Sequence, residues 1–219
     1  MRQVLLAALA AMALAPPAGA GSVASRGGDA IDVACLIYAG TKSSVCFSEK
    51  FLGALARDTT IVTSRTFQRV KLAGGELFSY PFAIMTGEGS FVLTEGERAN
   101  LRRYLERGGF LLASAGCSSK QWDDSFRREI KVIFPERDLA VVPMSHEIFH
   151  TVYDIKDLDT KGAEAKLEGL TLGGKVVLIY SADGLNDSYS LHGCCCCGGN
   201  EINNSQKVNA NILAYALLQ

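Results

Sequence analysis

The sequence lacks an excess of charge, a second long apolar run and any internal repeat. Its 22 basic and 23 acidic residues leave a net charge of −1, which favours neither nucleic acid nor an anionic membrane as a partner. The apolar run from Val4 to Ala15 is shorter than the about 20 residues that a membrane-spanning helix needs, and no later run is long enough either. The expected partner is therefore an unidentified small molecule or envelope protein.

The first 20 residues have the pattern of a secretory signal peptide. Arg2 precedes a run rich in leucine and alanine, and Ala18-Gly19-Ala20 forms an A-x-A cleavage site. Cleavage after Ala20 would give a periplasmic or secreted protein without a membrane span. Residues 21–30 are small and polar and are expected to form a flexible lead-in, and residues 31–219 have a length typical of one domain.

The stretch from residue 80 to residue 119 predicts a strand–helix–strand unit. Apolar runs at Phe82–Met85 and Phe110–Ala113 are typical of buried strands, and both end in loops. Between them, Thr94 is a good N-cap for a helix with an apolar face. Ligands in open parallel sheets bind beyond the carboxyl ends of the strands. The loops that follow these two strands are therefore the expected position of a site.

The flanking segments continue the alternation of strands and helices. Further strands are expected over Ile31–Gly40, Thr60–Thr63, Leu139–Val142 and Lys175–Tyr180. Further helices are expected after Ser48, over Trp122–Phe134 and after Asn200–Ser205. Two stretches are interpreted as irregular, a connection at Ser64–Phe78 and a surface loop region at Lys156–Gly174. This order predicts an α/β protein with a mostly parallel sheet and helices on both faces.

A series of phrases carries a resemblance to a known family. They are LIYAG, ELFSYPFAIMTGEGSFVLTEGERANLRRYLERGGFLLASAGC, WDDSFRREI, FPERDL, HEIFHTVYDI, VVLIYSADGL and NANILAYAL. In these phrases, which cover nearly the whole chain after residue 31, the sequence resembles the bacterial domain-of-unknown-function family numbered 4159 (DUF4159). The resemblance implies a three-layer, flavodoxin-like fold similar to that of class I glutamine amidotransferases. It implies no particular chemistry, because one fold hosts many functions.

Cys117 is the first candidate for chemistry. It follows the second central strand and precedes a helix, where an amidotransferase-like enzyme would place its nucleophile. A catalytic thiol would need a base from His146, His150 or His192, and amide donors from residues 86–89 for the oxyanion. Four residues separate Cys117 from the expected helix, unlike the tight turn of a nucleophile elbow. A structural or metal-binding thiol is therefore the favoured interpretation.

Residues 146–150, His-Glu-Ile-Phe-His, match the H-E-x-x-H pattern of zinc peptidases. On a helix, His146 and His150 could hold zinc while Glu147 acts as the base. Pro143 precedes the motif and β-branched and aromatic residues follow it, so at most one helical turn is expected. The favoured interpretation is that both histidines line a site from a loop.

His192 and the four consecutive cysteines Cys194, Cys195, Cys196 and Cys197 form the third candidate. Glycines on both sides would allow a coiled loop that gathers several thiols. The alternatives are disulfides in an oxidising compartment and a site for zinc or another thiophilic metal, with the metal slightly favoured. Seven cysteines in the chain leave at least one thiol over if all the others pair.

Acidic residues near the predicted strand ends complete the candidates, although solvated loop charges explain them equally well. The expected binding residues are Gly87, Glu88, Cys117, His146, His150 and Asp183. The leading hypothesis is a non-catalytic binding or assembly module on an amidotransferase-like scaffold, because no complete set of nucleophile, base and oxyanion donors is recognisable. The alternative is a hydrolase that uses Cys117 as its nucleophile or a metal held by His146 and His150.

Overall fold

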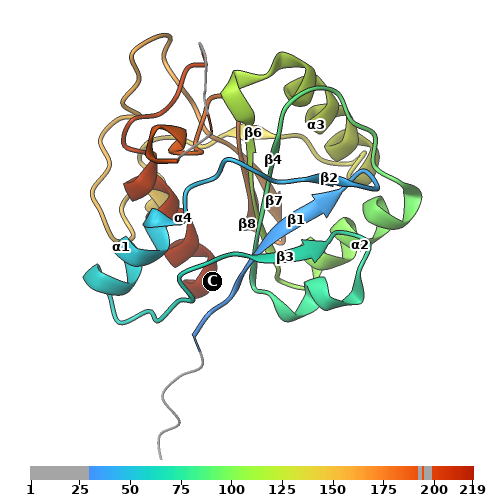
Figure 1. Ribbon diagram of the computed structural model, residues 1–219, viewed down its shortest axis with the longest axis horizontal. Helices are drawn as coiled ribbons and strands as arrows, with labels where there is room; N and C mark the ends of the chain where they lie inside the picture. Colours follow the sequence, from blue (N-terminus) through green and yellow to red (C-terminus); the bar gives the residue numbers. More distant parts are fainter. Residues whose placement is uncertain (1–29, 192–193, 195–198) are drawn as a thin grey trace, which may run out of the picture.

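The computed structural model describes residues 30–191, 194 and 199–219 (Figure 1). These residues form an α/β fold around an eight-stranded mixed sheet. The parallel strands at its centre are, in order, β1 (Val33–Tyr38), β4 (Phe82–Gly87), β5 (Phe110–Ala115) and β8 (Lys175–Ser181). The remaining strands are β3 (Gln68–Lys71), which is parallel to β1, and the antiparallel strands β2 (Lys42–Ser43), β6 (Ala140–Val141) and β7 (Glu168–Leu172).

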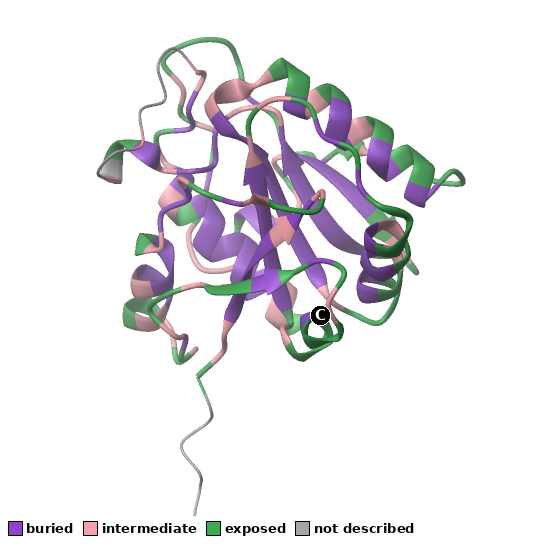
Figure 2. Cartoon of the chain, turned by 45° about the vertical axis from the view of Figure 1, so that its right-hand side comes forward, coloured by how far each residue is buried: buried purple, intermediate pink, exposed green. Residues whose placement is uncertain are grey.

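Helices pack on both faces of the sheet. One face is covered by α1 (Lys50–Asp58) and α4 (Ser205–Leu218), and the other by α2 (Glu95–Glu106) and α3 (Lys120–Ile133) (Figure 1). Because side chains alternate along a strand, the buried strands supply two apolar cores, one under each pair of helices (Figure 2). Short 3-10 helices occur at η1 (Gly75–Ser79), η2 (Gly116–Ser118), η3 (Glu147–Phe149) and η4 (Ser188–Ser190). No helix in the described parts of the chain is long and apolar enough to cross a membrane.

The predicted strand–helix–strand unit is confirmed as β4, α2 and β5. The two strands pair in parallel, from Phe82 beside Phe110 to Gly87 beside Ala115. Helix α2 begins at a capping box, in which the Thr94 hydroxyl accepts from the amide of Glu97 (3.2 Å) and the Glu97 carboxylate accepts from the amide of Thr94 (2.7 Å). This reciprocal pair fixes where the helix starts.

Three strands lie where the sequence predicted none. β2 follows the strand expected over Ile31–Gly40, in a stretch for which no strand was expected. β3 falls in the segment interpreted as an irregular connection, and β7 falls in the region interpreted as a surface loop. β3 buries only Val70 and exposes its other three residues, so it carries no apolar run. The strand predicted over Thr60–Thr63 is wrong, because Thr63 forms only an isolated bridge with Ile31. The strand that pairs with β1 on this side is β3.

Candidate functional site

The carboxyl ends of the central strands meet at one edge of the sheet. Gly87 of β4 lies beside Ala115 of β5, and Ser114 lies beside Ser181 of β8. The loops that follow these strands therefore share an edge, which we call the carboxyl edge. Open α/β sheets bind their ligands there.

At this edge the gap between β1 and β4 is filled by residues 42–44 of the chain itself. β1 pairs with β4 only from Val33 to Cys35, and beyond that point β2 pairs with β1 instead. Ser44 then bonds to both strands, because its amide donates to the carbonyl of Leu36 (2.9 Å) and its hydroxyl accepts from the amide of Thr86 (3.1 Å). The chain thus supplies the hydrogen bonds that an incoming strand would otherwise make.

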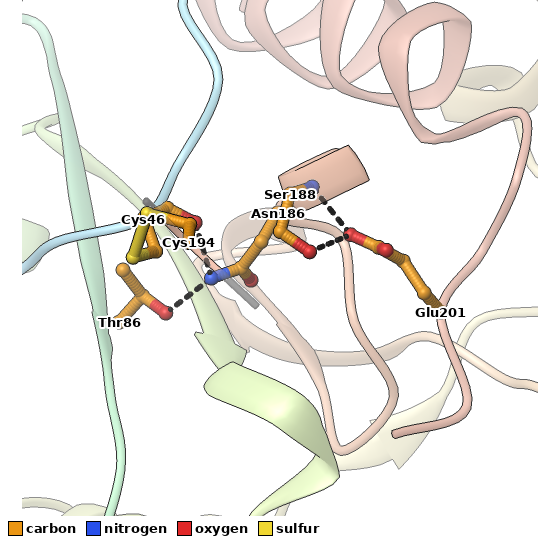
Figure 3. Close-up of a disulfide and its surroundings, with 6 residues drawn as sticks. All are labelled: Cys46, Thr86, Asn186, Ser188, Cys194 and Glu201. Carbon is orange, nitrogen blue, oxygen red and sulfur yellow. Dashed lines mark hydrogen bonds between the residues drawn. A yellow bond between two sulfur atoms is a disulfide. The ribbon is translucent and has the colours of Figure 1, made fainter. Parts of the chain in front are cut away.

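Asn186 ties this segment to the neighbouring strands (Figure 3). It lies in the turn after β8 and is only 1% exposed. Its side-chain nitrogen donates to the carbonyl of Cys46 (3.0 Å) and to the hydroxyl of Thr86 (2.9 Å), and its Oδ1 accepts from the hydroxyl of Ser114 (2.7 Å). One buried amide therefore joins the loop after β2 to the ends of β4 and β5. Buried polar groups of this kind are stable only when they are paired.

A disulfide between Cys46 and Cys194 closes the same region (Figure 3). The two residues are 148 positions apart in the sequence, and Cys46 has a left-handed backbone with φ 54°. The hypothesis of a thiolate metal site over Cys194–Cys197 is wrong for Cys194, because a disulfide sulfur is not a thiolate. His192 and Cys195–Cys197 lie outside the described residues. Among the described residues, no group of three or more histidines, cysteines and carboxylates is arranged to hold a metal.

Glu201 approaches the turn after β8 from its other side (Figure 3). It is buried, and its Oε1 accepts from the amide (2.6 Å) and the hydroxyl (2.9 Å) of Ser188. The backbones of Gly184 and Glu201 also form a parallel bridge. Glu201 therefore fixes the turn that carries Asn186 against the start of α4.

The backbone around Cys117 follows an unusual path between β5 and α3. Cys117 and Ser118 both have left-handed backbones, with φ 50° and 51°. The hydroxyl of Ser118 accepts from the amide of Asn200 (2.8 Å), and a Cβ on Gly199 would lie 2.7 Å from the carbonyl carbon of Cys117. Only glycine allows this close approach of two backbones. Cys117 is partly exposed at the carboxyl edge.

Glu88 and Gly87 lie next to Cys117 at this edge. A Cβ on Gly116 would lie 3.0 Å from the carbonyl of Gly87 and 3.3 Å from Cγ of Glu88. Gly87 has a packing reason to lack a side chain, because a Cβ there would clash with the hydroxyl of Tyr38. That hydroxyl donates to the carbonyl of Thr86 (3.0 Å), and burial raises the pKa of Tyr38 to about 12.

Asp183 joins the same edge from the end of β8. Its Oδ1 accepts from the side-chain amide of Asn200 (3.0 Å), whose backbone amide also reaches Ser118. Partial burial raises the pKa of the Asp183 carboxyl above its ordinary value, and the bond from Asn200 acts in the opposite direction. The structure thus brings Gly87, Glu88, Cys117 and Asp183 together.

His146 does not join them. Its ring packs edge-on against Tyr215 of α4, with centroids 5.5 Å apart, and Tyr215 packs against Phe110 at the amino end of β5. His146 Nδ1 accepts from the amide of Ile148 (3.2 Å) and so caps η3. The imidazole therefore serves a local turn on the α4 face, toward the end of β5 that is opposite to Cys117.

His150 is held by its own neighbours. Its Nδ1 lies 2.7 Å from a carboxylate oxygen of Asp154, and its Nε2 lies 2.8 Å from the carbonyl of Met144. Glu147 is exposed in η3, a single 3-10 turn, so the H-E-x-x-H residues do not share one face of an α-helix. This matches the expectation of at most one helical turn, and it gives no support to zinc binding by this motif.

The fold defines the chain as an α/β protein in which residues 42–44 fill the gap between β1 and β4 at the carboxyl edge. The family described as Domain of unknown function (DUF4159) matches residues 36–217, and the chain belongs to this family. No curated protein matches the sequence.

Proposed function

We propose that the protein is an exported, non-catalytic binding or assembly module on a flavodoxin-like, amidotransferase-like scaffold. The order of the parallel strands, β3-β1-β4-β5-β8, supports the scaffold. Numbered along the chain, this is the order 2-1-3-4-5 of flavodoxin-like sheets, with its switch point between β1 and β4. Helices on both faces agree with three layers.

The observation that carries the proposal is the filled gap at that switch point. An enzyme of this fold would hold its substrate in the crevice between β1 and β4. Here Ser44 occupies the crevice, is 3% exposed and bonds to both strands. His146 and His150 are engaged by other residues, which argues against a hydrolytic site built on these two histidines. The loops at the carboxyl edge then serve as a recognition surface.

Export is supported by the disulfide together with the signal-peptide pattern. Disulfides persist in oxidising compartments such as the periplasm and are rare in the cytosol. The bond between Cys46 and Cys194 closes the fold at the carboxyl edge, and the Ala18-Gly19-Ala20 pattern gives the corresponding cleavage site.

One observation favours the hydrolase alternative. Cys117 has a left-handed backbone and lies between a buried strand and a helix. Unusual backbone conformations of this kind cluster at active sites. A nucleophile elbow also presents its residue on a sharp strand-to-helix turn.

The test combines an activity assay with cross-linking. Purified wild type and Cys117→Ala are compared for ammonia release from glutamine and for hydrolysis of activated esters, and no activity that depends on Cys117 is expected. A photoreactive residue replaces Tyr189, which is 70% exposed beside the carboxyl edge, or Val132, which is 54% exposed on α3 and serves as the control. A cross-linked product in envelope extracts from position 189 but not from 132 supports a binding module. Turnover that is lost in Cys117→Ala establishes the hydrolase instead.

A further inference from the structure

Residues 42–46, the segment that fills the gap between β1 and β4, are attached mainly through polar contacts. Val45 is 51% exposed, and Lys42 and Ser43 are only partly buried. Ser44 is buried, but its side chain is small and polar. The first large apolar anchor comes afterwards, at Phe47, which is 6% exposed. The segment therefore contributes little to the apolar core, whose burial supplies most of the stability of a fold.

The segment imitates an added strand. Ser44 bonds to the backbone of β1 through the carbonyl of Leu36, and its hydroxyl contacts the carbonyl of Ile84 (3.4 Å) and the amide of Thr86 (3.1 Å) on β4. These groups are the open hydrogen-bonding positions that an extended peptide uses when it joins a sheet. A strand in this gap would place a small hydroxyl side chain at the position of Ser44.

The segment is also held from outside. Cys46, at its end, has a left-handed backbone that a non-glycine residue adopts at a cost, so other contacts must hold it there. Those contacts are the disulfide to Cys194 and the hydrogen bond from Asn186 to the Cys46 carbonyl. Without the disulfide, the hydrogen bonds of Ser44 and Asn186 still hold residues 42–46 in the gap, but no covalent cross-link does.

We propose that residues 42–46 are a displaceable plug of a site for an extended peptide, and that the Cys46–Cys194 disulfide is its latch. The inference rests on the proposed binding function and names its partner and its control. Opening the latch is a thiol–disulfide exchange with a dithiol: the protein bond gains two electrons and two protons to give two thiols, and the dithiol becomes a cyclic disulfide. The peptide that enters would be extended, with serine or threonine facing β4.

Hydrogen exchange read by mass spectrometry tests the latch. The full chain is compared in its oxidised form, after treatment with a dithiol, and as Cys46→Ser/Cys194→Ser. We expect the amides of Ser44 and Thr86 to exchange roughly tenfold faster or more without the disulfide, while the amides of β5 keep their protection. Equal protection of Ser44 and Thr86 in all three forms would overturn the proposal. So would loss of protection throughout the sheet, because the disulfide would then hold the whole fold.

A peptide added in trans tests the site. The probe is a fluorescent peptide of residues 41–47 with Cys46→Ser, and the control peptide carries Ser44→Ala in addition. Binding is expected to the reduced protein and to the double variant, with roughly tenfold weaker binding of the control because it lacks the bonds of the hydroxyl. No binding to the open forms, or equal binding to the oxidised protein, refutes the plug. If the peptide result refutes the plug but position 189 still gives a cross-linked product, the proposed binding function stands and only the plug is refuted. If position 189 gives no cross-linked product and turnover depends on Cys117, both the plug and the binding function are refuted.

Discussion

Replacing Asn186 by alanine should lower the free energy of unfolding by more than the loss of one hydrogen bond would, because its side chain joins three segments of the chain. The side-chain amide makes two buried hydrogen bonds, to the Thr86 and Ser114 hydroxyls, and a partly buried one to the Cys46 carbonyl. Each such bond contributes a net of about 1 kcal/mol, so Asn186→Ala should lower the free energy of unfolding by about 3 kcal/mol. Ser114 still accepts from the amide of Leu185 (3.0 Å), whereas the groups on Cys46 and Thr86 lose the donor that Asn186 supplied. For a domain of this size, the melting temperature should fall by roughly 6–12 °C.

Urea unfolding followed by circular dichroism measures the change, and thermal unfolding provides the second reading. Asn203→Ala is the matched control, because Asn203 is exposed and should change the free energy of unfolding by less than about 0.5 kcal/mol. A double-mutant cycle with Thr86→Val isolates the bond between the two side chains and should give a coupling energy of at least about 0.5 kcal/mol. A loss below about 1 kcal/mol in Asn186→Ala, or a coupling energy near zero, would refute the account of this network.

Three further predictions concern other parts of the chain. Arg98→Met removes the hydrogen bonds of 2.7 and 3.2 Å that the carboxylate of Glu129, which is 1% exposed, accepts from Arg98. The free energy of unfolding in urea should fall by about 2–3 kcal/mol. The control Lys120→Met, which breaks the exposed pair with Asp124, should leave the urea midpoint unchanged. Burial raises the pKa of the Asp183 carboxyl, so its contribution to stability is present at low pH and is lost as the pH rises above about 4. The difference in melting temperature between wild type and Asp183→Asn should therefore change across this pH range. A difference that stays constant with pH contradicts a raised pKa for Asp183. Intact mass of protein from the envelope fraction should show cleavage after Ala20, and a cytoplasmic chain that still begins at Met1 would rule out export.

The elements that the sequence predicts well have strong local signals. The unit from β4 to β5 combines two apolar runs with a capping box at Thr94 and Glu97, and each signal points to the same structure. β2, β3 and β7 were missed because tertiary contacts stabilise them. β3 has one buried residue, Val70, and β7 contains a buried carboxylate, Glu168, that is paired with Arg127 of α3. A charged residue in a strand is a reasonable sign of a loop until its partner is known.

Some residues of the candidate site could likewise be placed from the sequence, and others could not. Gly87, Glu88, Cys117 and Asp183 could be placed from strand ends alone, because parallel strands bring their carboxyl ends together. Asn186 could not be found in this way, because a polar residue in a turn is usually solvated. The partner of Cys194 was equally hidden, since sequence does not determine disulfide connectivity.

The long separation between Cys46 and Cys194 has a consequence for how the protein is made. Cys46 is synthesised before most of the sheet, so its thiol cannot meet its native partner until the chain beyond β8 has been made. It then meets four adjacent cysteines, at positions 194–197, of which the native structure pairs the first with it. Thiols so close in sequence compete at nearly equal effective concentration. The yield of correctly joined protein therefore depends on exchange among these cysteines after the sheet has formed, and a host that supplies disulfide isomerase should produce more of it than one that supplies an oxidant alone.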